Sequence, residues 1–112
     1  IDLNFSNEII YRELVGGTKE VIITDRKPSG TLQIEAVLLA TKNYFTVSTG
    51  STTGSITFQH GTATGNRATL TMAQSDLADV SYADMNGITM LNLPYVATPT
   101  AAGNDELSLV FT

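Results

Sequence analysis

The feature that most constrains the fold of this chain is a period-two alternation of apolar and polar residues in several short segments. The clearest case is residues 31–38, where every even position is apolar: Leu32, Ile34, Ala36 and Leu38. Successive side chains of a strand point to opposite faces, so this pattern predicts a half-buried strand. The same pattern predicts strands at 55–59, 67–72 and 107–111, with inward side chains at Ile56, Phe58, Ala68, Leu70, Met72, Leu107, Leu109 and Phe111.

The segment from Ile88 to Tyr95 changes parity part of the way along. Ile88 and Met90 fall on one parity, and Leu91, Leu93 and Tyr95 fall on the other. One extra residue would restore the register, which predicts a β-bulge near Met90 or Leu91. Because proline has no backbone N–H, Pro94 is expected to end this strand or to place it at a sheet edge.

Turn residues separate the predicted strands. Val15-Gly16-Gly17-Thr18 predicts a hairpin turn between strands at 9–14 and 19–24. Lys27-Pro28-Ser29-Gly30 predicts a turn into the strand that follows it, and residues 61–66 predict the longer loop of a second hairpin. Residues 98–104 form a third connection.

One stretch does not alternate. Between Val37 and Thr46 the apolar residues recur at spacings of three and four, which predicts a short helix near Leu39–Val47. The fold class expected for residues 1–112 is therefore mainly β: one domain, a β-sandwich or small barrel of about seven short strands with one short flanking helix.

The composition excludes several classes of protein. Hydrophobic residues make up 42% of the 112-residue chain and charged residues 15%, the opposite of the balance found in disordered chains. The net charge is −5, and only Arg26 and Lys27 are adjacent basic residues, which argues against tight binding to nucleic acid. There is no cysteine and no apolar run long enough to span a membrane. The chain begins at Ile1, so it is expected to be processed or to be the C-terminal portion of a longer protein.

The residues with catalytic or metal-binding potential form no coherent site. His60, the one histidine, has no nearby partners in the sequence, and Asp84-Met85-Asn86-Gly87 lacks the later ligands of a calcium loop. Residues 104–106 form an acidic cluster that is expected to be a turn before a strand, although it could bind a cation or a neighbour's basic patch. Asp76, Asp79 and Asp84 would need a substrate groove with aromatic platforms to act as a glycosidase pair. We therefore expect no catalytic, cofactor-binding or metal-binding residues.

Two segments carry a resemblance to a known family. The first is residues 48–61 with Gly65-Asn66-Arg67, and the second is residues 86–95 with the ending 103–111. Their order along the chain resembles that of phage tail tube proteins, over roughly residues 30–112. The resemblance implies a β-sandwich or barrel flanked by a helix, whose copies join edge to edge into a hexameric or pseudo-hexameric ring. Rings would stack, together with other tail proteins, into a tube that lets the genome pass without sequence-specific contact.

The same resemblance implies a place in the virion tail, assembled in the cytoplasm of a bacterial host, with a gene in a phage or prophage. The alternative is a β-sandwich binding module that recognises a glycan or a cell surface. Such a module would present aromatic side chains on its loops, and the candidates are Tyr44, Phe45, Tyr82 and Tyr95. An enzyme is not expected.

Overall fold

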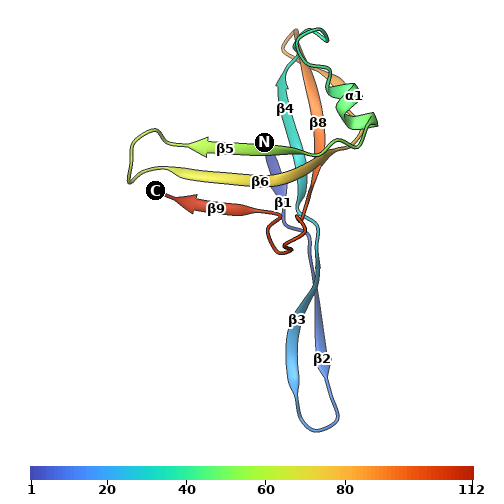
Figure 1. The fold of residues 1–112 in the computed structure, drawn as a ribbon, viewed down its shortest axis with the longest axis vertical. Helices are drawn as coiled ribbons and strands as arrows, with labels where there is room; N and C mark the ends of the chain where they lie inside the picture. The colour runs from blue at the N-terminus through green and yellow to red at the C-terminus, as the bar shows by residue number, and fades with distance from the viewer.

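The structure, a computed structural model, describes all of residues 1–112 and consists of nine strands and one short helix (Figure 1). The elements, in chain order, are β1 (Asp2–Asn4), β2 (Asn7–Glu13), β3 (Lys19–Arg26), β4 (Ser29–Glu35), α1 (Tyr44–Thr49), β5 (Gly54–His60), β6 (Ala68–Leu77), β7 (Ser81–Met85), β8 (Ile88–Thr98) and β9 (Ser108–Phe111). The mainly β prediction is confirmed.

Seven of the strands form one curled antiparallel sheet. Its main path runs β1-β4-β8-β6-β5, while β7 also pairs with β8 and β9 also pairs with β6. The strand β6 changes partners along its length: residues 68–71 pair with β9 and residues 74–77 pair with β8. The sheet therefore turns a corner along β6, and β5, β6 and β9 extend sideways from β4 and β8 (Figure 1). The hairpin β2–β3 forms a separate two-stranded sheet.

The hydrophobic core lies at this corner. Met72, Tyr95 and Ala97 are buried there, and they are surrounded by partly buried side chains: Leu3, Leu32, Ile56, Leu70, Leu77 and Leu107. The Tyr95 hydroxyl donates a hydrogen bond of 2.8 Å to the backbone carbonyl of Asp2, which attaches β1 to the sheet. Burial, and then the negative charge of Asp2, raises the pKa of the Tyr95 phenol and so favours the protonated, donating form.

A glycine makes room for this hydrogen bond. A Cβ atom on Gly30 would lie 1.9 Å from the Asp2 carbonyl oxygen and 2.7 Å from the Tyr95 hydroxyl. These distances are too short for any side chain at position 30. The nearer atom, the Asp2 carbonyl oxygen, belongs to the backbone and cannot move aside as a flexible side chain can. Gly30 therefore permits β1 to pair closely with β4 at the point where the Tyr95 hydroxyl binds the β1 backbone.

The predicted bulge at Met90 or Leu91 is wrong. The strand β8 keeps a continuous register with β4 from Met90 to Val96 and with β7 from Ile88 to Asn92. Its alternation changes because burial changes: Leu91, Leu93, Tyr95 and Ala97 are buried, whereas Ile88 is exposed near the turn. Bulges occur instead between Glu8 and Ile9 in β2 and between Gly54 and Ile56 in β5.

The prediction for Pro94 is also wrong, because Pro94 lies inside a central strand. Its carbonyl accepts a hydrogen bond of 2.9 Å from the backbone N–H of Ala78, which lies between β6 and β7. In an antiparallel strand the N–H and C=O of one residue point to the same side, so the missing N–H of Pro94 faces this gap. No ladder hydrogen bond is lost there.

The helix begins later than predicted. The spacing indicated a helix near Leu39–Val47, but α1 spans Tyr44–Thr49, since residues 38–42 form a turn in which the Leu38 carbonyl accepts from the N–H groups of Thr41 and Lys42. The Asn43 side chain accepts from the N–H of Thr46, which caps the helix at its start. No helix of the structure has the length and apolar character that crossing a bilayer requires.

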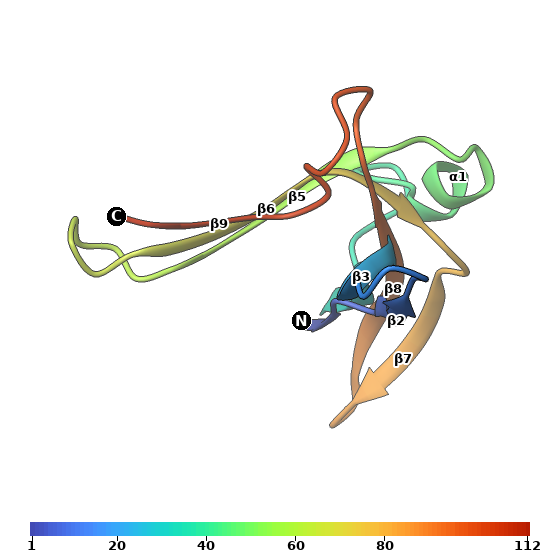
Figure 2. The ribbon, with the colours of Figure 1, turned by 90° about the horizontal axis from the view of Figure 1, so that it is seen from below.

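The chain is far more extended than a compact domain of the same length. Its radius of gyration is 18.0 Å, whereas about 13 Å is typical for 112 residues. Only seven of the 112 residues are buried. Two projections account for the extension: the β2–β3 arm (residues 7–26) and the β5–β6–β9 arm (residues 54–72 and 108–111), which point in different directions (Figures 1 and 2).

Candidate assembly surfaces

The β2–β3 arm has an apolar face with nothing packed on it. Its register places Ile9 opposite Ile23 and Tyr11 opposite Val21, and side chains opposite each other in a ladder share one face. All four residues are more than half exposed, and Val21 is the most exposed of them at 68%. A two-stranded hairpin is marginally stable by itself in water, so this face requires a cover.

The tip of the β2–β3 arm consists of charged residues and the hairpin turn. The Glu13–Lys19 ion pair, 3.0 Å long, follows the two apolar rows on the same face. Arg12 pairs with Glu20 on the opposite face. The predicted hairpin turn is confirmed, and Gly16 and Gly17 both adopt positive φ angles, which glycine tolerates without strain. The apolar face of the β2–β3 arm is therefore bounded at its tip by a pair of charges.

The β5–β6–β9 arm carries a second uncovered apolar face. Phe58, Leu70 and Leu109 form one row across the three strands, and His60, Ala68 and Phe111 form the next row outward. These rows continue the face that carries Met72 in the core. The opposite face is mostly polar, with Thr57 opposite Thr71 and Gln59 opposite Thr69.

The structure corrects three predicted inward positions on this arm. Phe58, Leu109 and Phe111 have the predicted parity, but Phe111 is 75% exposed and the other two are about half exposed. The reason is that the side chains of β1, β4 and β8 that cover this face, among them Leu3, Leu32 and Tyr95, reach it only at the corner. Beyond the row of Ile56, Met72 and Leu107, the three strands continue outward with no layer over their apolar face. Alternation thus predicted correctly which face of the arm is apolar, but the prediction that this face is buried was wrong.

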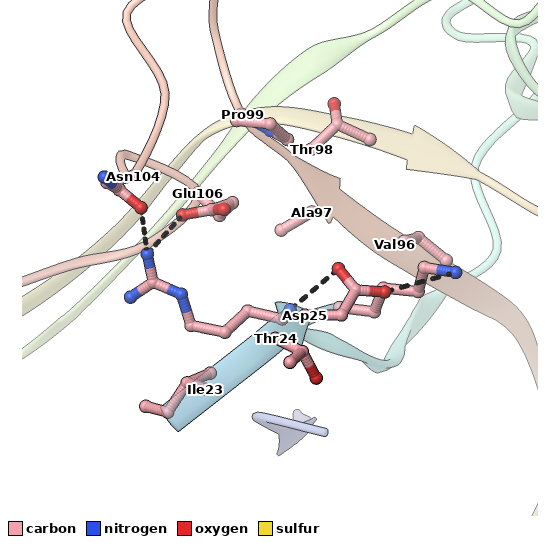
Figure 3. Close-up of a pocket in the computed structure, with 11 residues that line it drawn as sticks. Ile23, Thr24, Asp25, Val96, Ala97, Thr98, Pro99, Asn104 and Glu106 are labelled. Atoms are coloured by element: carbon pink, nitrogen blue, oxygen red, sulfur yellow. Dashed lines mark hydrogen bonds and ion pairs between the residues drawn. The ribbon is translucent and has the colours of Figure 1, made fainter. Parts of the chain in front are cut away.

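A polar latch holds the base of the β2–β3 arm. The Arg26 guanidinium donates a hydrogen bond to the Asn104 side chain and lies 3.9 Å from the Glu106 carboxylate. Asn104 and Glu106 come from the connection between β8 and β9, at the rim of an open notch of about 630 Å³ (Figure 3). The Lys27 ammonium lies 3.7 Å from the Asp25 carboxylate on the same side. We call Arg26, Asn104 and Glu106 the latch.

The acidic cluster at residues 104–106 thus meets basic charge from its own chain. Its middle residue, Asp105, has a different role: it accepts hydrogen bonds from the backbone N–H of Thr100, at 2.8 Å, and from the Thr100 hydroxyl. These bonds, the hydroxyl one first, lower the pKa of Asp105 below its ordinary value. The ionised Asp105 therefore closes the loop that presents the latch residues.

The other residues with catalytic or metal-binding potential are not brought together. No group of three or more His, Asp or Glu side chains converges anywhere in the structure. The Asp84 carboxylate accepts from the N–H of Gly87 at 3.3 Å and lies in the β7–β8 hairpin. His60 is exposed and is the last residue of β5. Asp76 is half-buried in β6, opposite Val96 of β8.

The four aromatic candidates for glycan recognition do not form a platform. Tyr95 is only 1% exposed and belongs to the core. Phe45 of α1 and Tyr82 of β7 pack against each other, with ring centroids 5.3 Å apart. Tyr44 lies under the Lys42 ammonium, which is 5.6 Å from its ring centroid.

A smaller cavity of about 310 Å³ lies between α1 and the sheet. Leu32, Leu93 and Val47 supply apolar walls, and Lys42 and Ser75 contribute polar groups to the lining. The Ser75 hydroxyl is buried without a hydrogen-bond partner. No residue in this lining forms a nucleophile and base pair.

Sequence reasoning predicted the β2–β3 hairpin but missed its apolar face. The signal was present in Ile9-Ile10-Tyr11 and Val21-Ile22-Ile23, because a hairpin with apolar residues on both parities presents apolar groups on both faces. Comparison of the chain with protein-family models, with characterised proteins and with solved structures gives no match. The uncovered apolar faces and the latch are therefore the features on which a functional argument rests.

Proposed function

We propose that this chain is a structural subunit that self-assembles by β-sheet contacts into rings, and that the rings stack into a phage-type tail tube for genome passage. The observation that carries the proposal is the excess of exposed surface. The chain exposes 7664 Å² and has a mass of 11.9 kDa. A compact monomer of that mass exposes about 5,950 Å².

The size of this excess supports contact with two neighbours. The difference is about 1,700 Å², and a specific interface of standard size buries about 800 Å² on each partner. A subunit in a ring has one neighbour on each side and forms one contact with each. Two such contacts would cover about the surface that this chain exposes beyond the compact value.

Unpaired strand edges support the same proposal. In the main sheet, β1 and β5 end the strand order, and β7 and β9 each pair with a single strand. The two strands of the β2–β3 arm pair only with each other. Free N–H and C=O groups along such edges are templates for a strand of another chain. Edge-to-edge pairing between copies would satisfy these groups in the ring.

The charge of the chain is compatible with a conduit for DNA. The net charge is −5, and the few basic residues do not form a stripe. Phosphates are held by clusters of lysine and arginine, so an acidic wall lets a duplex slide without binding it tightly.

The test is the oligomeric state of the chain, and of any longer protein that contains it, over a wide range of concentration. Sedimentation velocity should show association that increases with concentration, and electron microscopy should show rings or tubes with a central channel. A sample that stays monomeric at every concentration overturns the proposal. If that monomer also binds to a glycan array, the binding-module alternative replaces it.

A further inference from the structure

We infer that the apolar face of the β2–β3 arm of one copy packs against the apolar face of the β5–β6–β9 arm of a second copy. The inference rests on the proposed function, since it names the two surfaces through which copies associate. It is carried by three observations: both faces are uncovered, they match in length and pattern, and the two faces of one chain point in different directions.

The two faces have the same length, two rows each, although the β5–β6–β9 face is three strands wide and the β2–β3 face is two strands wide. Each has two apolar rows: Ile9–Ile23 and Tyr11–Val21 on the β2–β3 arm, and the rows of Phe58 and Phe111 on the β5–β6–β9 arm. Rows on one face of a strand are two residues, about 7 Å, apart in both arms. Neither pair of rows contains a carboxylate, an ammonium or a guanidinium group, and the polar groups among them are the Tyr11 hydroxyl and the His60 imidazole. Packing the faces together therefore removes apolar surface from water without burying a formal charge.

Polar groups mark the ends of both faces. The Glu13–Lys19 pair follows the second row of the β2–β3 arm, and Arg67 lies beyond the second row of the β5–β6–β9 arm, beside the loop of residues 61–66. Both patches thus stop after two rows. When the two rows of one face pack against the two rows of the other, the charged groups lie at the rim of the contact, where water still reaches them.

A single chain does not join its own two faces. The arms extend in different directions in both views (Figures 1 and 2). The Arg26 latch ties the base of the β2–β3 arm to the connection between β8 and β9, which holds that direction. The occupant of each face is consequently the complementary arm of another copy.

The resulting contact is heterologous, because the two faces come from different parts of the chain. After a first contact, one copy still has a free β5–β6–β9 face and the other copy still has a free β2–β3 arm, so a chain of such contacts either closes as a ring or continues as a filament. Every copy in the assembly uses both faces. This arrangement accounts for two contacts per chain, in agreement with the excess surface of about 1,700 Å².

Single-cysteine crosslinking tests the inference directly, because the chain has no cysteine of its own. Val21→Cys places a thiol on the apolar face of the β2–β3 arm, and Leu109→Cys places one on the apolar face of the other arm. Val110→Cys is the matched control, since Val110 is the next residue along β9 and points to the opposite face. All three positions are exposed, so the core is not altered. A short bismaleimide is added to equimolar mixtures of two variants.

We expect a crosslinked heterodimer from Val21→Cys mixed with Leu109→Cys, at least tenfold more than from Val21→Cys mixed with Val110→Cys. Equal yields from the two mixtures overturn the inference, as does a Val21→Cys homodimer that exceeds the heterodimer. A double variant, Val21→Cys with Leu109→Cys, that crosslinks within one chain also overturns it.

Sedimentation of the unmodified chain separates this inference from the proposed function. If the unmodified chain associates but the heterodimer is absent, the assembly uses other surfaces, and only the arm-to-arm contact is wrong. If the unmodified chain never associates, the proposed function and the contact that rests on it are both wrong.

Discussion

Replacing Val21 by threonine should weaken self-association while leaving the fold of the monomer intact. Valine and threonine have the same shape and both suit strands, so the change replaces one methyl group by a hydroxyl. Val21 is 68% exposed in the single chain. Substitution at such a site changes the free energy of unfolding by no more than about 0.5 kcal/mol.

The cost appears only when a second copy covers the arm. A buried methyl group contributes about 0.8 kcal/mol, and about two-thirds of that remains to be gained at Val21 on assembly. Burying a hydroxyl without a partner costs a further 1–3 kcal/mol or so. Together these give about 1.5–3.5 kcal/mol per contact, which corresponds to a roughly 10- to 400-fold weaker association.

Sedimentation equilibrium measures the concentration at which half of the chains are associated, and urea unfolding measures the stability of the monomer. The matched control is Val110→Thr, the same replacement at a residue that is 47% exposed on the opposite face of β9. Association of that variant should be unchanged. The reasoning is refuted if Val21→Thr associates as tightly as the parent chain, or if both variants weaken association equally.

Three further predictions concern the core, the latch and the loop. Tyr95→Phe removes the hydrogen bond to the Asp2 carbonyl and should lower the free energy of unfolding by about 0.5–1.5 kcal/mol. A urea titration measures this change, and an unchanged midpoint would show that β1 is held by packing alone. Arg26→Ala should change global stability by less than about 1 kcal/mol, because its partners are near the surface. It should nevertheless broaden the arm-to-body distances measured by electron spin resonance between labels, and unchanged distances count against the latch. Because the pKa of Asp105 is lowered in the folded chain, its bonds with Thr100 are present above the ordinary carboxyl pKa and are lost as pH falls through the lowered value. The protection of the Thr100 amide, which is its exchange rate relative to the intrinsic rate at the same pH, should fall on that acidification, and an Asp105→Asn variant should not show the step.

The local β structure was predictable because it depends on neighbouring residues. Leu32 and Ile34 alternate with polar positions, and β4 has the predicted faces as far as Glu35, where it ends. The predicted inward position of Leu38 is wrong, because Leu38 lies in the turn before α1 and is 78% exposed. The glycines of the β2–β3 turn and of the loop at 61–66 adopt the positive φ angles that their positions require. In each case the signal spans a few residues, and the physical cause acts over the same distance.

Errors arose where a partner strand or a missing layer decided the outcome. Pro94 was expected at an edge, but β6 ends and β7 begins opposite it, so the lost N–H faces a gap. The helix was placed too early because the Leu38 carbonyl closes a turn before Asn43 caps α1. The latch between Arg26 and residues 104–106 joins positions 78 or more apart, and no local pattern links them.

The amino-acid sequence determined that this chain forms strands, where most of its turns fall, and which side chains of each strand are apolar, because alternation and turn chemistry act between near neighbours. Only the tertiary structure decided which of those apolar faces are covered. Burial requires side chains from elsewhere in the chain, and the curled sheet brings them together at its corner but not along its two arms.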